Sequence, residues 1–565
     1  MNIRLHHESI LHILIIFSLL LFGILVHQIE YPNNHDGYFH LRMVEMMQEL
    51  GHYPVEDMYS SYPHRPFNYP PGYHYALYIL SQIITNSWLA WKLMPLLSLT
   101  LTLPLIYYAG KTLHSENTGL FAALSFILLP HVIIEIFKPD NTLFNHFLTA
   151  FAFACLLYYR TNKSEYTALL FGTSLGLYLC SWYGSLFYVL LFGSFFIFET
   201  FKDKRLENTK YLLWGVAPIF LLPAFIMPQI TFGCWDSHVE VCPLDKFEKL
   251  PFGPTIFKAM SNLGLITKYD DSYTPPIKRY SKYVSELQFI PEIIPDFFGP
   301  IFYLLLPTFI IYLSKREYML PAWLLSASLI LIPQGVKYLN FVYIPSVLIF
   351  GYSLDKLYSN SKTNKFFFVA LTTYLLFVTY VNYPLLETRR YELSPDLVEA
   401  GKWIRNNAEN KTFMNYWPDG HYIAYNRGIN VIDGLLYSGR VDEDRTQFLY
   451  GFWTLPEGFA WYNLWSKDID YVWVRKSYIS TSNTFAEMSG WNESGYKING
   501  REVVVSKPWI NTFLTKALGP QDFVCFNRVF RNNEVTIFKV NDECILNPML
   551  IDKEVSLNTE RAEQP

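Results

Sequence analysis

The chain has 565 residues, which is long enough for more than one domain. Hydrophobic residues make up 51% of it and charged residues only 17%, whereas soluble globular chains carry about 25% charged residues. The formal net charge of −4 excludes the basic field that a nucleic-acid-binding protein needs. An aromatic content of 18% is typical of a membrane protein, in which Trp and Tyr gather at the lipid–water interfaces.

Apolar segments recur along the first two thirds of the chain. A segment of about 20 such residues predicts a membrane-spanning helix, because only a helix satisfies its own backbone hydrogen bonds in lipid. About eleven segments qualify by this criterion, namely 9–27, 90–110, 118–135, 143–159, 166–181, 183–200, 211–229, 298–314, 318–334, 338–355 and 366–384.

The positions of Lys and Arg predict how these spans are oriented, since short cytoplasmic loops collect positive charge. One set of alternate loops carries them, so these loops and the N-terminus are predicted to be cytoplasmic. The opposite side then holds two long loops, 28–89 and 230–297, and everything after residue 384. We therefore expect a transmembrane domain over residues 1–384 and a soluble extracytoplasmic domain over residues 385–565.

The region after residue 384 is far more polar than the rest of the chain. Pro395 to Asn407 has a helix-like pattern, while Tyr471 to Arg475 and Glu502 to Ser506 have strand-like patterns. These patterns predict a mixed α/β domain. Two cysteine pairs lie outside the apolar segments, and disulfides on an oxidising side explain them as well as unpaired thiols do: Cys234 with Cys242, and Cys525 with Cys544.

Three carboxylates lie beside predicted spans on the extracytoplasmic side. Asp36 follows the first span, Asp140 lies in a very short loop before the fourth, and Glu286 lies near the end of the loop 230–297. Acids from different loops can converge on one divalent cation, and carboxylate oxygens suit Mg²⁺ or Mn²⁺. Such an ion can neutralise a phosphate leaving group. Taken singly, each of these acids is explained equally well as a solvent-exposed loop residue. The hypothesis of a metal site therefore depends on the three acids lying close together in the fold.

Two further features could bind ligands. In the segment Asn415 to Tyr422, Trp417 lies beside a turn-forming Pro-Asp-Gly, which could form a rigid pocket wall; a structural turn around a core Trp is the alternative. Lys337 is a cation at an extracytoplasmic membrane edge. It could bind a lipid phosphate or simply anchor the chain at the interface.

In chain order, these segments resemble those of the catalytic subunit of oligosaccharyltransferases, a GT-C-type glycosyltransferase family, and especially its archaeal single-subunit branch. The stretch from Asp36 through Tyr-Phe-His to Arg42 is similar to the family's first-loop stretch, and the Asp140 loop resembles its paired-acid motif. Val284-Ser-Glu-Leu-Gln288 is similar to the family's Ser/Thr-Val-Ser-Glu motif and is the most specific match.

Two later segments continue the resemblance. Gly335-Val-Lys337-Tyr338 resembles the stretch that holds the family's donor-binding basic residue, and Tyr416-Trp-Pro-Asp-Gly420 resembles its WWDYG signature. The resemblance implies an α-helical polytopic membrane protein of GT-C type, with about 11 to 13 transmembrane helices and a C-terminal extracytoplasmic mixed α/β domain.

The resemblance also implies an activity. The chain would be a metal-dependent enzyme that transfers a glycan from a polyprenyl-(pyro)phosphate carrier to Asn in Asn-X-Ser/Thr. Its partners would be the lipid-linked oligosaccharide, an acceptor polypeptide and the bilayer, with no obligate partner subunit and no nucleic acid. The implied residues are Asp36, Asp140 and Glu286 for catalysis; these three with Thr142 for Mn²⁺ or Mg²⁺; Lys337 and Arg42 for the donor; and Tyr416, Trp417, Asp419 and Gly420 for the acceptor.

Three departures from the family pattern leave alternatives open. Thr142 stands where relatives have a second metal-binding acid or His, and Lys337 stands where they commonly have Arg, which loses a bidentate grip on phosphate. Pro418 replaces the Asp of the WWDYG signature, with Asp419 one position later. The chain could instead be another lipid-linked glycosyltransferase, acting on Ser/Thr, a lipid or a polymer, or a membrane subunit that has lost catalysis.

Overall fold

The protein forms two compact units of contacts. The first combines Met1–Tyr53, Asn68–Tyr273 and Tyr280–Tyr391, and the second combines Pro54–Phe67, Thr274–Arg279 and Glu392–Pro565. The computed structural model describes residues 35–54, 69–137, 140–182, 184–202, 208–226, 317–334, 336–360, 393–432, 448–482 and 509–544, together with short pieces at 9–13, 15–16, 19–20, 23, 58–59, 309–310, 312–313, 485, 496–499 and 502–505.

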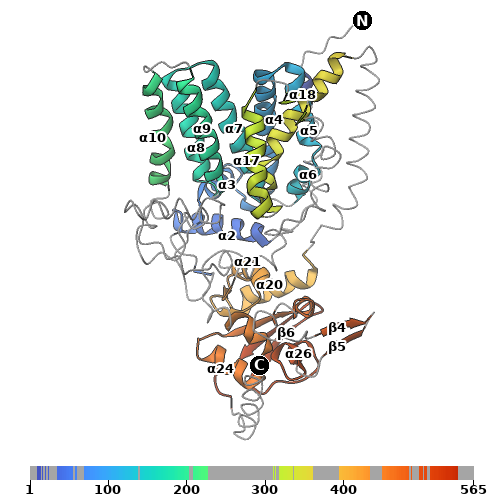
Figure 1. Ribbon diagram of the computed structural model, residues 1–565. Helices are drawn as coiled ribbons and strands as arrows, with labels where there is room; N and C mark the ends of the chain where they lie inside the picture. The colour runs from blue at the N-terminus through green and yellow to red at the C-terminus, as the bar shows by residue number, and fades with distance from the viewer. Residues whose placement is uncertain are drawn as a thin grey trace, which may run out of the picture. The chain divides into compact units, whose positions relative to one another are not determined.

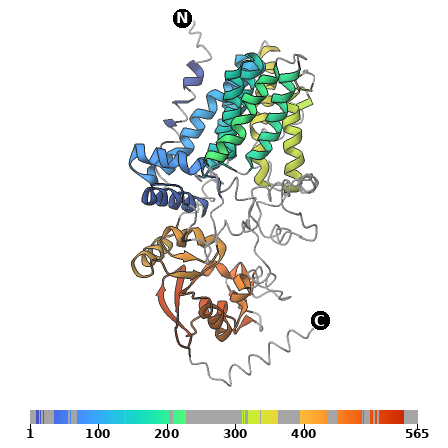
Figure 2. The ribbon, with the colours of Figure 1, turned by 90° about the vertical axis from the view of Figure 1, so that its left-hand side faces the viewer.

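The first unit is helical. Helices α7, α8, α9 and α10 pack side by side, and α4, α5 and α18 pack against one another next to α7 (Figure 1, Figure 2). The bounds are α2 His35–Leu50, α3 Gly72–Ile84, α4 Ser87–Leu113, α5 Glu116–Ile127, α6 Pro130–Phe137, α7 Thr142–Thr161, α8 Glu165–Leu179, α9 Ser185–Phe201, α10 Thr209–Ile226, α17 Met319–Gln334, the 3₁₀ helix η4 Val336–Phe341 and α18 Tyr343–Asn360.

Local sequence explains where several of these helices begin. The side chains of Asn86, Ser115 and Ser164 accept hydrogen bonds from backbone N–H groups in the first turns of α4, α5 and α8. Such caps provide acceptors for the backbone N–H groups of the first turn, which have no hydrogen-bond partner within the helix. The helices also approach closely at small residues, as in many membrane proteins. A Cβ on Gly172 of α8 would lie 2.1 Å from the carbonyl oxygen of Gly215 in α10.

Within the described residues, α4 and α7 are long and apolar enough to cross a membrane. The predicted span 118–135 is not one straight helix. It is divided into α5 and α6, which are bent by 55° at the break. The physical reason is Pro130, which disfavours helical geometry at the preceding residue and begins α6. The other apolar helices are shorter: Ser185–Phe201, Thr209–Ala224 and Met319–Leu329.

The second unit is a mixed α/β fold, as the sequence predicts. Its five-stranded sheet has the order β2-β1-β3-β7-β6, in which β1 pairs in parallel with β2 and β3, and β7 pairs in antiparallel fashion with β3 and β6. The strands are β1 Thr412–Met414, β2 Ile429–Asn430, β3 Tyr471–Arg475, β6 Phe526–Arg531 and β7 Val535–Val540; β4 Tyr496–Asn499 and β5 Glu502–Val505 form a separate hairpin, and the helices are α20 Pro395–Asn407, α21 Trp417–Tyr425, α24 Glu457–Trp465 and α26 Phe513–Leu518.

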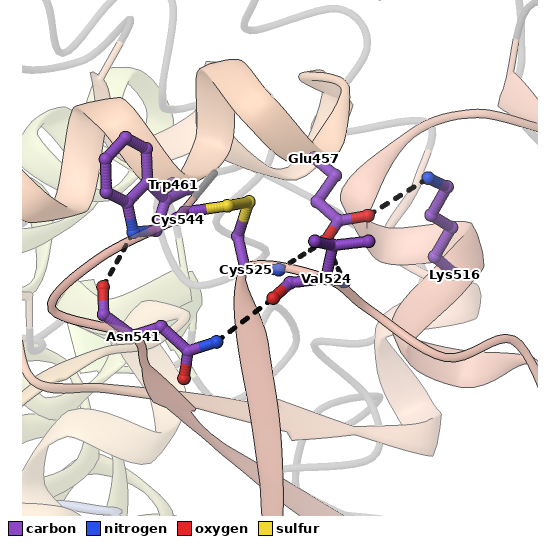
Figure 3. Close-up of a disulfide and its surroundings, with 7 residues drawn as sticks. All are labelled: Glu457, Trp461, Lys516, Val524, Cys525, Asn541 and Cys544. Atoms are coloured by element: carbon purple, nitrogen blue, oxygen red, sulfur yellow. Dashed lines mark hydrogen bonds and ion pairs between the residues drawn. A yellow bond between two sulfur atoms is a disulfide. The ribbon is translucent and has the colours of Figure 1, made fainter. Parts of the chain in front are cut away.

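A disulfide between Cys525 and Cys544 closes the end of this unit. Figure 3 shows it beside Trp461 of α24, whose indole N–H donates to the carbonyl of Asn541 at 2.8 Å. Glu457 accepts hydrogen bonds from the backbone N–H groups of Val524 and Cys525, which fixes the strand end that carries the disulfide. The pair Cys234 and Cys242 lies outside the described residues.

Candidate active site

Helix α2 carries the first candidate acid. Asp36 lies in its first turn, where a carboxylate is favoured by the helix dipole, and its side chain is exposed. One turn further on, His40 is buried, and its Nδ1 lies 2.8 Å from Nε2 of His74 in α3. This histidine pair fixes the inner face of α2 to α3.

The start of α3 is in turn fixed to the end of α8. The backbone N–H of Gly72 donates to the carbonyl of Cys180 at 2.6 Å. The backbones approach so closely that a Cβ on Gly72 would lie 2.8 Å from that oxygen and 2.4 Å from Oγ of Ser181. Only glycine fits this position without displacement, so α3 has little freedom to move relative to the helical bundle.

The second candidate acid, Asp140, lies just before α7. Its Oδ1 accepts the backbone N–H of Thr142, the first residue of α7, at 2.6 Å. The side-chain amide of Asn141 donates to the hydroxyl of Tyr69 at 2.5 Å, and the rings of Tyr73 and Phe144 lie 5.5 Å apart. The short loop is therefore held by residues at and before the start of α3.

The shared contact with α3 brings the Asp36 helix and the Asp140 loop into one neighbourhood. The ring of His40 packs edge-on against Tyr73 at 4.7 Å. Burial raises the pKa of Tyr73 well above its ordinary value, and the nearby charge of Asp140 acts in the same direction. Burial lowers the pKa of His74, helped by His40 and by the positive charge of Arg42.

The other residues predicted for this site are placed as follows. Arg42 is buried in α2, 2% exposed, and Thr142 is buried in the first turn of α7. Lys337 lies in η4, but its side chain and the whole of Glu286 lie outside the described residues. In the part of the chain that is described, no group of three His, Cys, Asp or Glu side chains is arranged to hold a metal ion. Metal binding by Asp36, Asp140, Thr142 and Glu286 thus stays a prediction.

The oxygen chemistry of the two described acids fits a hard divalent cation, and neither carboxylate is deeply buried. The sequence analysis did not identify the residues that support these acids, namely His40, His74, Tyr69 and Tyr73. A His one turn after Asp36 was the available signal, but no sequence pattern pairs it with a residue 34 positions later.

The candidate acceptor segment lies at the carboxyl end of β1, where β1 leads into α21. Because β1 and β3 are parallel neighbours, their carboxyl ends meet at one edge of the sheet, which is where ligands bind in many α/β folds. Tyr416 and Trp417 are half-buried there, whereas Asp419 and Gly420 are buried. The edge thus presents aromatic surface and keeps the carboxylate inside.

Asp419 lies in a dense set of hydrogen bonds. Its Oδ1 accepts from Nη1 of Arg475 at 2.9 Å, and its Oδ2 accepts from Nε1 of Trp473 at 3.1 Å and from the hydroxyl of Tyr478 at 2.6 Å. The three donors come from the end of β3 and from the 3₁₀ helix that follows it, Lys476–Ile479. The sequence analysis identified Asp419 but none of these partners.

Tyr416, Tyr478 and Arg475 each keep one protonation state near neutral pH, because the pKa of each group is raised. Burial raises the pKa of Tyr416 to about 12; a hydrogen bond with Trp417 opposes this shift and the charge of Asp419 adds to it. Burial and then the charge of Asp419 raise the pKa of Tyr478 well above its ordinary value. Burial alone would lower the pKa of Arg475, but Asp419 and Glu534 outweigh it and raise that pKa.

The fold is that of GT-C-type membrane glycosyltransferases, and the resemblance drawn from the sequence is confirmed at this level. The structure is similar to the apo oligosaccharyltransferase of Archaeoglobus fulgidus, with a TM-score of 0.72 and 14% identity over 94% of this chain and 80% of that one. It is also similar to the archaeal oligosaccharyltransferase AglB of Archaeoglobus fulgidus in complex with an inhibitory peptide and a dolichol-phosphate, with a TM-score of 0.69 and 13% identity over 93% of this chain and 79% of that one.

A more distant likeness extends to other enzymes of this fold. ArnT of Cupriavidus metallidurans bound to undecaprenyl phosphate matches with a TM-score of 0.53 and 12% identity over 93% of this chain and 97% of that one. No protein-family profile matches the sequence, and no curated protein matches it. At these identities the comparisons establish the fold alone.

Proposed function

We propose that this protein is an oligosaccharyltransferase that transfers a glycan from a polyprenyl-(pyro)phosphate carrier to Asn in Asn-X-Ser/Thr. The observation that carries the proposal is the packing of the Asp36 helix and the Asp140 loop against one short helix, α3. Tyr69 and Tyr73 contact both segments that carry the two acids, on a fold shared with archaeal oligosaccharyltransferases.

Each candidate residue has a role in this reaction. The amide nitrogen of the acceptor Asn attacks the anomeric carbon, the bond from that carbon to the phosphate oxygen breaks, and the phosphate leaves with its electron pair. Asp36 and Glu286 accept hydrogen bonds from the amide and orient it, and one of these two carboxylates takes up the single proton that the nitrogen loses, which is positioning catalysis with proton transfer. Lys337 and Arg42 bind the anionic donor group.

A bound Mn²⁺ or Mg²⁺ would stabilise the negative charge that develops on the leaving phosphate. Asp36, Asp140 and Glu286 would hold the ion, with Thr142 beside them. The segment of Tyr416, Trp417, Asp419 and Gly420 would recognise the acceptor peptide. In this proposal the N-terminus is cytoplasmic, and the acids and the C-terminal unit lie on the extracytoplasmic side of the membrane.

One alternative has support of its own. The same fold occurs in ArnT and in the arabinofuranosyltransferase AftD of Mycobacteria, which matches with a TM-score of 0.53 and 14% identity over 96% of this chain and 40% of that one. A glycosyltransferase that uses a polyprenyl-phosphate donor with a different acceptor therefore remains the second candidate. The acceptor, and not the donor, distinguishes the two.

The test is an in vitro transfer assay with purified protein, a fluorescent Asn-X-Thr peptide and lipid-linked oligosaccharide. We expect a glycopeptide, loss of product with EDTA, and recovery on adding Mn²⁺ or Mg²⁺. A peptide with Gln in place of Asn should give no product. Transfer of sugar to another acceptor, with none to the Asn peptide, would support the second candidate.

Substitutions then test the site. Asp140→Ala and Glu286→Gln should abolish transfer while the purified protein stays folded, with a loss of about 0.5–2 kcal/mol of stability in Asp140→Ala, because that variant lacks the bond to the N–H of Thr142. Glu116→Gln is the matched control, because Glu116 is also an acid in the first turn of a helix, but it is half-exposed and paired with Lys111 at 2.7 Å. Full activity in Asp140→Ala would remove that residue from the site.

A further inference from the structure

The carboxylate of Asp419 is buried, 3% exposed, and both of its oxygens accept hydrogen bonds. Its donors are three different kinds of group: a guanidinium, an indole N–H and a phenol. Bonds to a carboxylate are among the stronger ones in proteins, and removing a partner from a buried group is costly. Because the residue is almost fully buried and both oxygens are already hydrogen-bonded, the carboxylate is poorly placed to bond with an acceptor peptide.

The bonds continue beyond Asp419 in two directions. Arg475 also pairs with Glu534, which accepts the hydroxyl of Ser394, the N-cap of α20. On the other side, the hydroxyl of Tyr478 donates to Asp419 and accepts the backbone N–H of Tyr416 at 3.1 Å. The network therefore reaches the backbone N–H of Tyr416, the residue that precedes Trp417.

The ring of Tyr416 packs against neighbouring aromatic rings. The ring of Tyr416 lies edge-on to Tyr478 at 5.6 Å and to Phe485 at 5.1 Å. Its ring also lies 6.0 Å from that of Trp417 and 6.4 Å from that of Tyr450. Both residues retain exposed surface. The network thus holds a preformed aromatic surface at the edge of the sheet.

We infer that Asp419 is a positioning residue for acceptor binding, which acts with Tyr478 and Arg475 to hold Tyr416 and Trp417, and that it does not itself bind the hydroxyl of the acceptor's Ser or Thr. This inference rests on the proposed function. Under this inference, Tyr416 and Trp417 contact the Ser or Thr of the acceptor's Asn-X-Ser/Thr. Arg475 and Tyr478 act indirectly, by holding these two aromatic residues in place.

The test compares two acceptor peptides, Asn-X-Thr and Asn-X-Val, which have nearly the same shape and differ by one hydroxyl. A site that bonds a hydroxyl directly rejects the analogue without it by a large factor, and loses that discrimination when the bonding group is removed. The measured quantities are KM, kcat and the ratio of kcat/KM for the two peptides. The variants are Asp419→Asn, Tyr478→Phe and the double variant, with Glu409→Gln as a control that removes an exposed acid paired with Arg427 in the same unit.

We expect Asp419→Asn and Tyr478→Phe each to raise KM for Asn-X-Thr about tenfold, with kcat nearly retained. The Thr/Val ratio should keep its wild-type value in both. The double variant should be no worse than the more severe single variant, because both changes break one network. Glu409→Gln should match the wild type.

Two results would overturn the inference: a tenfold or greater fall in the Thr/Val ratio in Asp419→Asn alone, or an unchanged KM in that variant. Tyr478→Phe removes a single oxygen, so it serves as the test if Asp419→Asn does not fold. Wild-type protein that glycosylates neither peptide would count against the proposed function. The near-ultraviolet circular dichroism of the aromatic pair, altered in the same way by both variants, would then still test the positioning role.

Discussion

Gly72 begins α3 at the point where that helix meets the end of α8. The N–H of Gly72 bonds to the carbonyl of Cys180, and a Cβ at this position would lie 2.8 Å from that oxygen and 3.0 Å from its carbon. Both obstacles are backbone atoms, which cannot rotate away. Gly72→Ala should therefore displace α3, together with Tyr73 and His74.

The size of the displacement follows from the contact. Ordinary van der Waals contact begins at 3.4 Å, so the 2.8 Å approach requires a movement of 3.4 − 2.8 = 0.6 Å. Because α3 supports both the Asp36 helix and the Asp140 loop, the shift reaches the two candidate acids. A misplacement of about 1 Å can cost a hundredfold in rate, so we expect transfer to fall roughly ten- to a hundredfold.

The assay is glycopeptide formation by purified protein, at equal amounts of folded enzyme. Gly193→Ala is the matched control: Gly193 lies inside α9, and its added Cβ would meet nothing within 4 Å. That variant should keep its activity and gain a little helix stability. Wild-type activity in Gly72→Ala would refute the idea that α3 positions the acids.

Three further predictions concern pH, the disulfide and the metal. Burial, then His40 and Arg42, lower the pKa of His74, so as the pH falls this histidine is protonated in the unfolded chain before it is protonated in the folded protein. The free energy of unfolding should therefore decrease from about pH 6.5 toward pH 5, by at most about 1.4 kcal/mol per pH unit. Thermal unfolding measured across this range should show a smaller decrease for His74→Phe. Reduction of the Cys525–Cys544 bond, which spans 19 residues, should destabilise the C-terminal unit by about 3 kcal/mol, and calorimetry with and without reductant measures it. Isothermal titration of Mn²⁺ into apo protein should show binding that Asp140→Ala weakens, and unchanged binding in that variant would remove Asp140 from the metal set.

Some features could be predicted from the sequence because their causes are local. The span 143–159 is mostly apolar and forms α7, and the helix from Pro395 to Asn407 begins at the predicted residue because Ser394 caps it and Pro395 suits its first turn. The strand Tyr471–Arg475 is likewise present as predicted.

The sequence alone determined that this is a helical membrane protein with a polar C-terminal α/β unit, because apolar length and residue periodicity are properties of neighbouring positions. Tertiary structure decided which residues meet. His40 pairs with His74 across 34 positions, and Asp419 is held by Arg475, 56 positions later, because parallel β1 and β3 end at the same edge. Such contacts depend on how whole elements pack, and no local pattern records that packing.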